Sequence, residues 1–191
     1  MDLESNNLTG QVPHSIGQLK ALNQLTISQK KKIGNIPETI GNLVSLGYLD
    51  LSQNNLKGPI PIGISNCTIL RRLELSQNSF SGDMSGINFP FSLYIFSAHS
   101  NKFYGNLTTS LANFTRLTWL DLRKNQLIGE LPHYLANFEK LRVLSLGYNN
   151  LHGRIPQWIA NLTKLQVLDL SNNKFSGRVS PNLDRFRGFA Y

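Results

Sequence analysis

The chain has 191 residues, 40% of them hydrophobic, and a formal charge of +8. The apolar share excludes wholesale disorder, and no run of about 18 apolar residues is present that could span a membrane. The basic residues are mostly scattered and accompany no recognised nucleic-acid-binding module, so a solvated surface is predicted and no nucleic-acid partner. The first residues show no basic and apolar pattern of a signal peptide.

A repeat of 24 residues organises the chain, with one step of 23. Residues 1–191 are interpreted as a single array whose last unit is degenerate and which has no capping domain. The eight repeat starts are Met1, Leu25, Leu49, Leu73, Phe96, Leu120, Leu144 and Leu168. A glycine stands nine residues after every start, which indicates a backbone turn that a Cβ would obstruct.

Within a unit, the first predicted element is a short strand. The alternation in Tyr48-Leu49-Asp50-Leu51-Ser52 has a period of two, so the leucines enter the core and Asp50 and Ser52 face outward. Strands of successive units should pair in parallel. A segment such as residues 62–66 is predicted to return along the opposite side as a short helical turn or loop.

An asparagine follows each strand in seven of the eight units. A buried asparagine side chain offers one acceptor and two donors, which suits backbone groups where the chain leaves a strand. Stacked at one repeat spacing, these amides are predicted to form a ladder. Its members are Asn6, Asn54, Asn78, Asn101, Asn125, Asn149 and Asn173.

The unit with three consecutive lysines departs from this pattern. Lys30 occupies the asparagine position, and Lys32 stands where a core Leu or Phe is expected. Burying an unpaired ammonium would cost several kcal/mol. We therefore expect Lys32 to turn outward or Ile33 to take the inward place.

The unit reads LxxLxLSxNxLxGxIPxxIxNLxx, as in residues 141–163. It resembles the plant-type leucine-rich repeat of receptor-like kinases, receptor-like proteins and polygalacturonase-inhibiting proteins, and the resemblance covers essentially the whole chain. It implies an α/β repeat solenoid, a right-handed superhelix with a concave parallel β-sheet, convex short helices or loops, and extra short strands near the Gly-x-Ile-Pro element. It also implies a location at the outer face of the plasma membrane or in the extracellular space. Cysteine-paired caps, usual in such ectodomains, are missing, so we expect a piece of a larger receptor.

Glycosylation is predicted from five Asn-x-Ser/Thr sequons, which are typical of secreted proteins. They lie at Asn7, Asn66, Asn106, Asn113 and Asn161. Three of them, Asn66, Asn113 and Asn161, share a column with asparagines that lack a sequon, so there the repeat itself also accounts for the residue. Cys67 falls in a core column, which favours a buried, inert thiol over an intermolecular disulfide.

No enzymatic activity is predicted. Ser76, His99 and Asp121 can be drawn as a Ser-His-Asp group, but neither a nucleophile elbow nor an oxyanion hole accompanies them. The other histidines are isolated and show no metal-ligand spacing. No catalytic residue, metal or cofactor is therefore assigned.

The outward positions of the middle units carry the candidate ligand-binding residues. Most units hold Asp, Ser and Gln there, whereas these hold aromatic and basic residues, which binding hot spots favour. The candidates are Arg71, Arg72, Tyr94, His99, Trp119, Arg123, Lys124, Arg142 and Tyr148. Chance enrichment is the alternative, since exposed aromatic residues also occur singly.

The predicted function is recognition of a peptide, protein or cell-wall oligosaccharide by the ectodomain of a cell-surface receptor. One alternative is a soluble inhibitor of a cell-wall-degrading enzyme, whose acidic cleft a basic concave face would block. Another is a co-receptor or structural scaffold with lateral contacts. The sequons disfavour an intracellular recognition protein, and a membrane would be reached only through a segment outside this chain.

Overall fold

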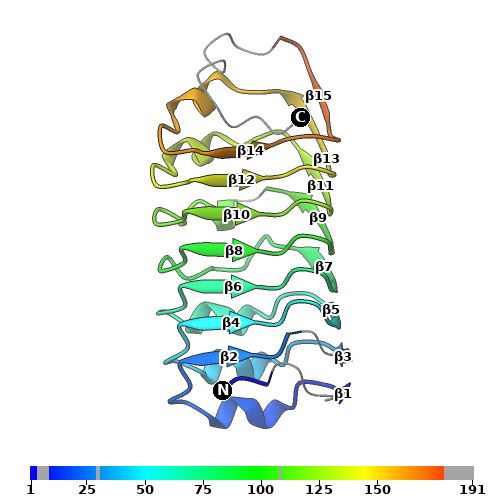
Figure 1. Ribbon diagram of the computed structural model, residues 1–191, viewed down its shortest axis with the longest axis vertical. Helices are drawn as coiled ribbons and strands as arrows, with labels where there is room; N and C mark the ends of the chain where they lie inside the picture. The colour runs from blue at the N-terminus through cyan, green and yellow to red at the C-terminus, as the bar shows by residue number, and fades with distance from the viewer. Residues whose placement is uncertain (4–8, 29–30, 108, 179–191) are drawn as a thin grey trace.

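The computed structural model describes residues 1–3, 9–28, 31–107 and 109–178. Two parallel sheets run along the long axis of the molecule (Figure 1). The main sheet contains one strand from each repeat after the first, paired in chain order. Its strands are β2 (Gln24–Thr26), β4 (Tyr48–Asp50), β6 (Arg72–Glu74), β8 (Ile95–Ser97), β10 (Trp119–Asp121), β12 (Val143–Ser145) and β14 (Val167–Asp169).

The second sheet lies beside the main one and is built from the segment that follows each ladder position. This confirms the extra short strands that the repeat type implies. The strands are β1 (Thr9–Gly10), β3 (Lys31–Gly34), β5 (Asn55–Gly58), β7 (Ser79–Asp83), β9 (Lys102–Asn106), β11 (Gln126–Gly129), β13 (Asn150–Arg154) and β15 (Lys174–Ser176).

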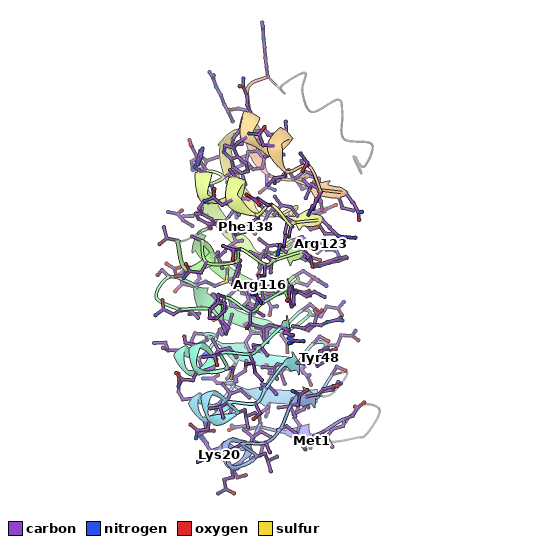
Figure 2. The ribbon with its side chains drawn as sticks, turned by 90° about the vertical axis from the view of Figure 1, so that its left-hand side faces the viewer. Met1, Lys20, Tyr48, Arg116, Arg123 and Phe138 are labelled. Atoms are coloured by element: carbon purple, nitrogen blue, oxygen red, sulfur yellow. The ribbon has the colours of Figure 1, made fainter. Side chains whose placement is uncertain are left out.

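The convex side is formed by short 3₁₀ turns of three to five residues (Figures 1 and 2). They are η1 (His14–Gln18), η2 (Glu38–Asn42), η3 (Ile62–Asn66), η4 (Thr109–Leu111), η5 (His133–Asn137) and η6 (Gln157–Asn161). A proline with φ between −65° and −75° directly precedes every five-residue turn, because its ring presets that angle. None of the helices in the described segments is long and apolar enough to cross a membrane.

The core is a stack of side chains in register along the main sheet. Leu49 is paired with Leu25 and Leu73, and Leu73 with Phe96, all four of them buried. Because Leu73 and Phe96 stay in register, the 23-residue step is absorbed on the convex side, where residues 84–93 contain no 3₁₀ turn. Phe89 fills the space there, with its ring centroid 5.2 Å from that of Phe96.

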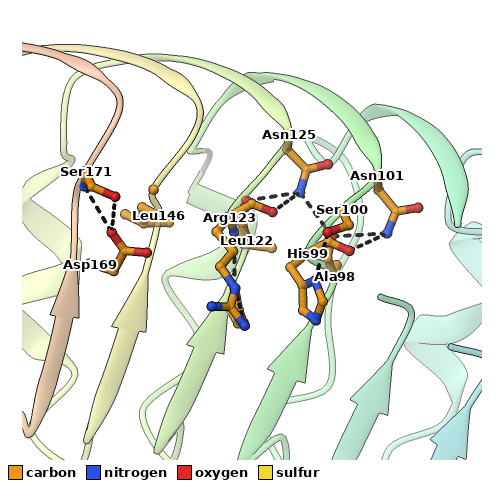
Figure 3. Close-up of polar contacts among 12 residues, drawn as sticks. Ala98, His99, Ser100, Asn101, Leu122, Arg123, Asn125, Leu146, Asp169 and Ser171 are labelled. Atoms are coloured by element: carbon orange, nitrogen blue, oxygen red, sulfur yellow. Dashed lines mark hydrogen bonds and ion pairs between the residues drawn. The ribbon is translucent and has the colours of Figure 1, made fainter. Parts of the chain in front are cut away.

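Asparagine amides join successive repeats where the chain leaves the main sheet. Asn125 Nδ2 donates to Ala98 O and Leu122 O, both at 3.0 Å (Figure 3). Its Oδ1 accepts the Phe103 N–H at 3.0 Å. Each amide thereby satisfies backbone groups in its own and the preceding repeat. The same bonding pattern occurs at Asn54, Asn78, Asn101, Asn149 and Asn173. Asn6 lies outside the described residues.

The expectation for Lys32 is wrong. Its side chain remains in the core position with an exposed fraction of 9%, whereas Ile33 is 49% exposed. The Lys32 ammonium donates to Thr9 O at 2.9 Å, and the Lys32 N–H donates to Asn54 Oδ1 at 3.1 Å. Because the aliphatic stem fills the core position and a backbone carbonyl binds the charge, no inversion of the strand is needed.

Candidate functional site

The concave face is formed by the outward side chains of the main sheet, which flank the buried residue at the centre of each strand. One column lies a residue before the centre: Gln24, Tyr48, Arg72, Ile95, Trp119, Val143 and Val167. A second lies a residue after it: Thr26, Asp50, Glu74, Ser97, Asp121, Ser145 and Asp169. A third lies three residues after it: Ser28, Ser52, Ser76, His99, Arg123, Gly147 and Ser171.

An apolar strip crosses four neighbouring strands of this face. Ile95, Trp119, Val143 and Val167 are direct partners in the sheet register. Trp119 is 42% exposed and Val143 only 7%, so the indole offers the largest accessible apolar area in the strip. Sequence reasoning identified Trp119 alone, and the three aliphatic neighbours become visible only when the first column is read across successive repeats.

The concave arginines are held by carboxylates of their own strands. Arg123 Nε lies 3.1 Å from Asp121 Oδ2, and Arg72 Nε lies 3.0 Å from Glu74 Oε1. Burial raises the pKa of both carboxyl groups, and the neighbouring guanidinium in each pair opposes this effect. Positive and negative charges therefore alternate, and the face is not the uniformly basic surface that the inhibitor alternative assumes.

His99 and Arg123 lie side by side after neighbouring strands (Figure 3). The Ser100 N–H donates to Arg123 O at 2.9 Å, and His99 Nδ1 lies 3.0 Å from Ser100 Oγ. Burial, together with the charges of Arg123 and Lys124, lowers the pKa of His99, which favours the neutral imidazole. Asp121 binds Arg123, so the contacts of His99 and Asp121 do not form a Ser-His-Asp chain.

The remaining candidates lie on the two borders of the concave face. Lys124 and Tyr148 follow the strands in left-handed backbone conformation, with φ of 55° and 56°, and the Lys124 Nζ lies 5.6 Å from the centroid of the Tyr148 ring. Arg71, Tyr94 and Arg142 precede the strands on the opposite border. The nine candidates thus form a central group with two flanks rather than one patch.

The described sequon asparagines are all exposed and lie away from the concave face. Asn66 and Asn161 are the last residues of η3 and η6, Asn113 follows η4, and Asn106 ends β9. Asn7 lies outside the described residues. Glycans at the four described positions would leave the concave face open.

Models of the leucine-rich repeat match residues 115–175 and residues 1–19 and 45–67, together more than half of the chain. No curated protein matches the sequence.

Several solved structures share the fold. The plant peptide hormone receptor RGFR1, in complex with RGF2, is 32% identical with a TM-score of 0.89, over 95% of this chain and 29% of that one. The Arabidopsis receptor kinase HAESA, in complex with the peptide hormone IDA and the co-receptor SERK1, is 35% identical with a TM-score of 0.89, over 96% and 31%. A TDR receptor is 29% identical with a TM-score of 0.89, over 97% and 32%. The chain thus spans less than a third of each of these proteins.

Proposed function

The chain belongs to the leucine-rich repeat family, in the form found in plant receptor ectodomains, and on that premise we propose that it recognises a peptide on its concave face. The similarity to RGFR1 and HAESA, both solved with peptide hormones, supports the peptide as the ligand class. The observation that carries the proposal is the apolar strip of Ile95, Trp119, Val143 and Val167 beside Arg123.

The strip fits an extended chain that lies along the axis of the solenoid. Neighbouring strands are about 4.8 Å apart, so four strands span about 14 Å, the length of roughly four extended residues. An apolar ligand residue would pack on the Trp119 indole. Beside it, the Arg123 guanidinium and the His99 imidazole are placed to donate hydrogen bonds to a carboxylate or carbonyl group.

The proposal places the chain outside the cell, where the exposed asparagines of η3 and η6 would carry glycans. It assigns the chain to ligand recognition rather than catalysis and leaves room for a co-receptor, as in the HAESA complex with SERK1. The ion pairs of the concave face weigh against the inhibitor alternative, because the charges of Asp121 and Glu74 offset those of Arg123 and Arg72, the arginines that an acidic cleft would contact.

The test is an affinity comparison with a peptide from a screen of secreted plant peptides. Trp119→Ala should weaken binding by roughly thirtyfold, or about 2 kcal/mol, as removal of a central aromatic anchor does. The matched control is Ile62→Ala, because Ile62 is a large apolar residue of the convex side with 66% exposure. Loss of binding in Ile62→Ala with parental affinity in Trp119→Ala would move the site to the convex side and refute the proposal.

A further inference from the structure

A hollow of about 420 Å³ opens at the border of the main sheet in the N-terminal half of the molecule. It lies where the chain rises from the convex turns into strands β4 and β6, on the edge that faces the viewer in Figure 2, near the labelled Tyr48. The residues that line it are Asn23, Gly47, Tyr48, Ile69, Arg71 and Arg72.

The hollow exists because one side chain is missing from a column. Two residues before each strand centre stand Asn23, Gly47, Arg71, Tyr94, Thr118, Arg142 and Gln166. Within that described column, Gly47 alone lacks a side chain. Its backbone is held as in the other repeats, since its N–H donates to Asn23 O at 2.8 Å and its carbonyl accepts from Arg71 N at 2.8 Å.

Nothing at Gly47 requires a glycine for the fold. Its φ is not in the left-handed region, and an added Cβ would meet the Asn23 amide no closer than 3.4 Å, an ordinary contact. The absent side chain therefore creates space without relieving any clash, and a larger residue would fill that space without disturbing the backbone.

The walls of the hollow combine apolar surface with positive charge. The Tyr48 ring lies beneath the Arg72 guanidinium, 5.3 Å from its carbon to the ring centroid, and Arg72 is in turn held by Glu74. Ile69 is 46% exposed. Arg71 is exposed, and within the described segments it makes no ion pair with a carboxylate.

We propose that this hollow binds an anionic group, a carboxylate or sulfate, carried on a compact apolar or aromatic body. The free guanidinium of Arg71 offers a planar fork of donors that fits either anion, while the apolar body packs against Ile69 and Tyr48. The volume falls within the roughly 300–1,000 Å³ typical of small-ligand sites. This inference goes beyond the proposed function, because it involves different repeats from the Trp119 strip and does not require that strip to bind anything.

The chain contains its own control for the role of the hollow. Arg142 occupies the same column as Arg71, three repeats further on, and its N–H likewise donates at 2.8 Å to the carbonyl of the preceding repeat. The residue of the preceding repeat is Thr118 for Arg142, whereas it is Gly47 for Arg71. Arg142 is thus a similarly exposed cation beside a filled position.

The experiment is a titration of the ¹⁵N-labelled chain followed by NMR, with phenylacetate as the probe and phenylacetamide as its neutral counterpart. Saturable shifts are expected at the amides of Asn23, Gly47 and Arg71 for the acid alone. Arg71→Gln should weaken binding by about tenfold or more, as loss of a charged hydrogen-bond partner does, whereas Arg142→Gln should leave it unchanged. Gly47→Thr should abolish binding at parental thermal stability, because Thr118 occupies the equivalent position.

A second arm distinguishes a free acid from the end of a peptide chain. Gly-Gly-Phe is titrated as its acid and as its C-terminal amide. If the tripeptide acid binds and phenylacetate does not, the site is supported and its ligands are the C-termini of peptides. If phenylacetate binds and the tripeptide acid does not, the site is supported and its ligands are free aromatic acids. Absence of saturable binding for both acids, equal binding of phenylacetamide, or parental binding in Gly47→Thr would each overturn the proposal. Parental phenylacetate binding in Trp119→Ala would separate this site from the concave-face proposal.

Discussion

Asp121 and Arg123 form an ion pair on the concave face in which the carboxylate side chain is 3% exposed and the guanidinium side chain 44% exposed. The Arg123 N–H also donates to Asp121 Oδ1 at 3.2 Å. The buried partner therefore orients the exposed one, and the cation that a ligand would meet has a fixed direction.

Burial raises the pKa of Asp121 despite the opposing effect of Arg123. The folded chain therefore binds this proton more tightly than the unfolded chain, and protonation favours folding. The stabilisation that comes from protonating Asp121 is fully present below the unfolded-state pKa of about 3.9. It is lost as the pH rises through the folded-state pKa. We expect the free energy of unfolding of the parent to rise relative to that of Asp121→Asn as the pH falls from neutral. Urea unfolding of both proteins between neutral and acidic pH measures this difference in free energy, with the exposed Glu139→Gln as the control. A difference that does not change with pH would contradict a raised pKa of Asp121.

Asn125→Leu should destabilise the middle repeats. The change leaves the Phe103 N–H without its side-chain acceptor, and a buried unsatisfied group costs about 1–3 kcal/mol. It also removes one of two amide donors from each of the Ala98 and Leu122 carbonyls, which keep Asn101 Nδ2 and Asn149 Nδ2 as donors. We expect a loss of about 3 kcal/mol in denaturant unfolding and faster hydrogen exchange at the Phe103 amide. The same substitution at the exposed Asn137 is the control. Unchanged exchange at Phe103 would mean that the amide ladder does not protect the repeat junction.

Gly129→Ala should cost more stability than Gly86→Ala, although both glycines adopt left-handed φ angles, +90° and +82°. A Cβ at Gly86 would meet no atom within 4 Å, whereas one at Gly129 would lie 2.6 Å from Asn106 Oδ1. Backbone strain alone is worth about 1–2 kcal/mol, so the excess at Gly129 measures the contact with the preceding repeat. In thermal unfolding, the double variant Asn106→Ala with Gly129→Ala should regain the additional stability that Gly129→Ala loses relative to Gly86→Ala. Equal losses of stability in the two glycine variants would count against a steric reason for the glycine nine residues after each repeat start.

The Cys67 thiol should be unreactive in the folded chain. It is fully buried, and burial raises its pKa to about 11, so almost no thiolate exists at neutral pH. We expect iodoacetamide to modify the protein only under conditions that unfold it, as measured by intact mass. Rapid modification of the native chain would show that the convex core opens around this residue.

The sequence by itself determined the fold. Periodic leucines, the asparagine position and the glycine that follows it predict a leucine-rich repeat solenoid, which the structure and the family models confirm. The reason is that a solenoid is built from contacts between equivalent residues of neighbouring units, so a column read along the sequence is also a line of contacts in space. Leu49 and Leu73 are 24 residues apart in the chain and adjacent in the sheet.

Only the tertiary structure decided the contacts of the side chains that lie outside the core or depart from the repeat pattern. Asp121 partly neutralises Arg123, and the Lys32 ammonium donates a hydrogen bond to the Thr9 carbonyl. The missing side chain of Gly47 leaves a hollow that Arg71 helps to line. These outcomes depend on side-chain rotamers and on packing between different columns, whereas periodicity describes only the equivalence of positions within one column. Core positions that hold the usual apolar residue repeat the same packing in every unit and can therefore be predicted from the pattern. Surface positions differ from unit to unit, so their charge pairs and cavities arise only when the repeats are stacked.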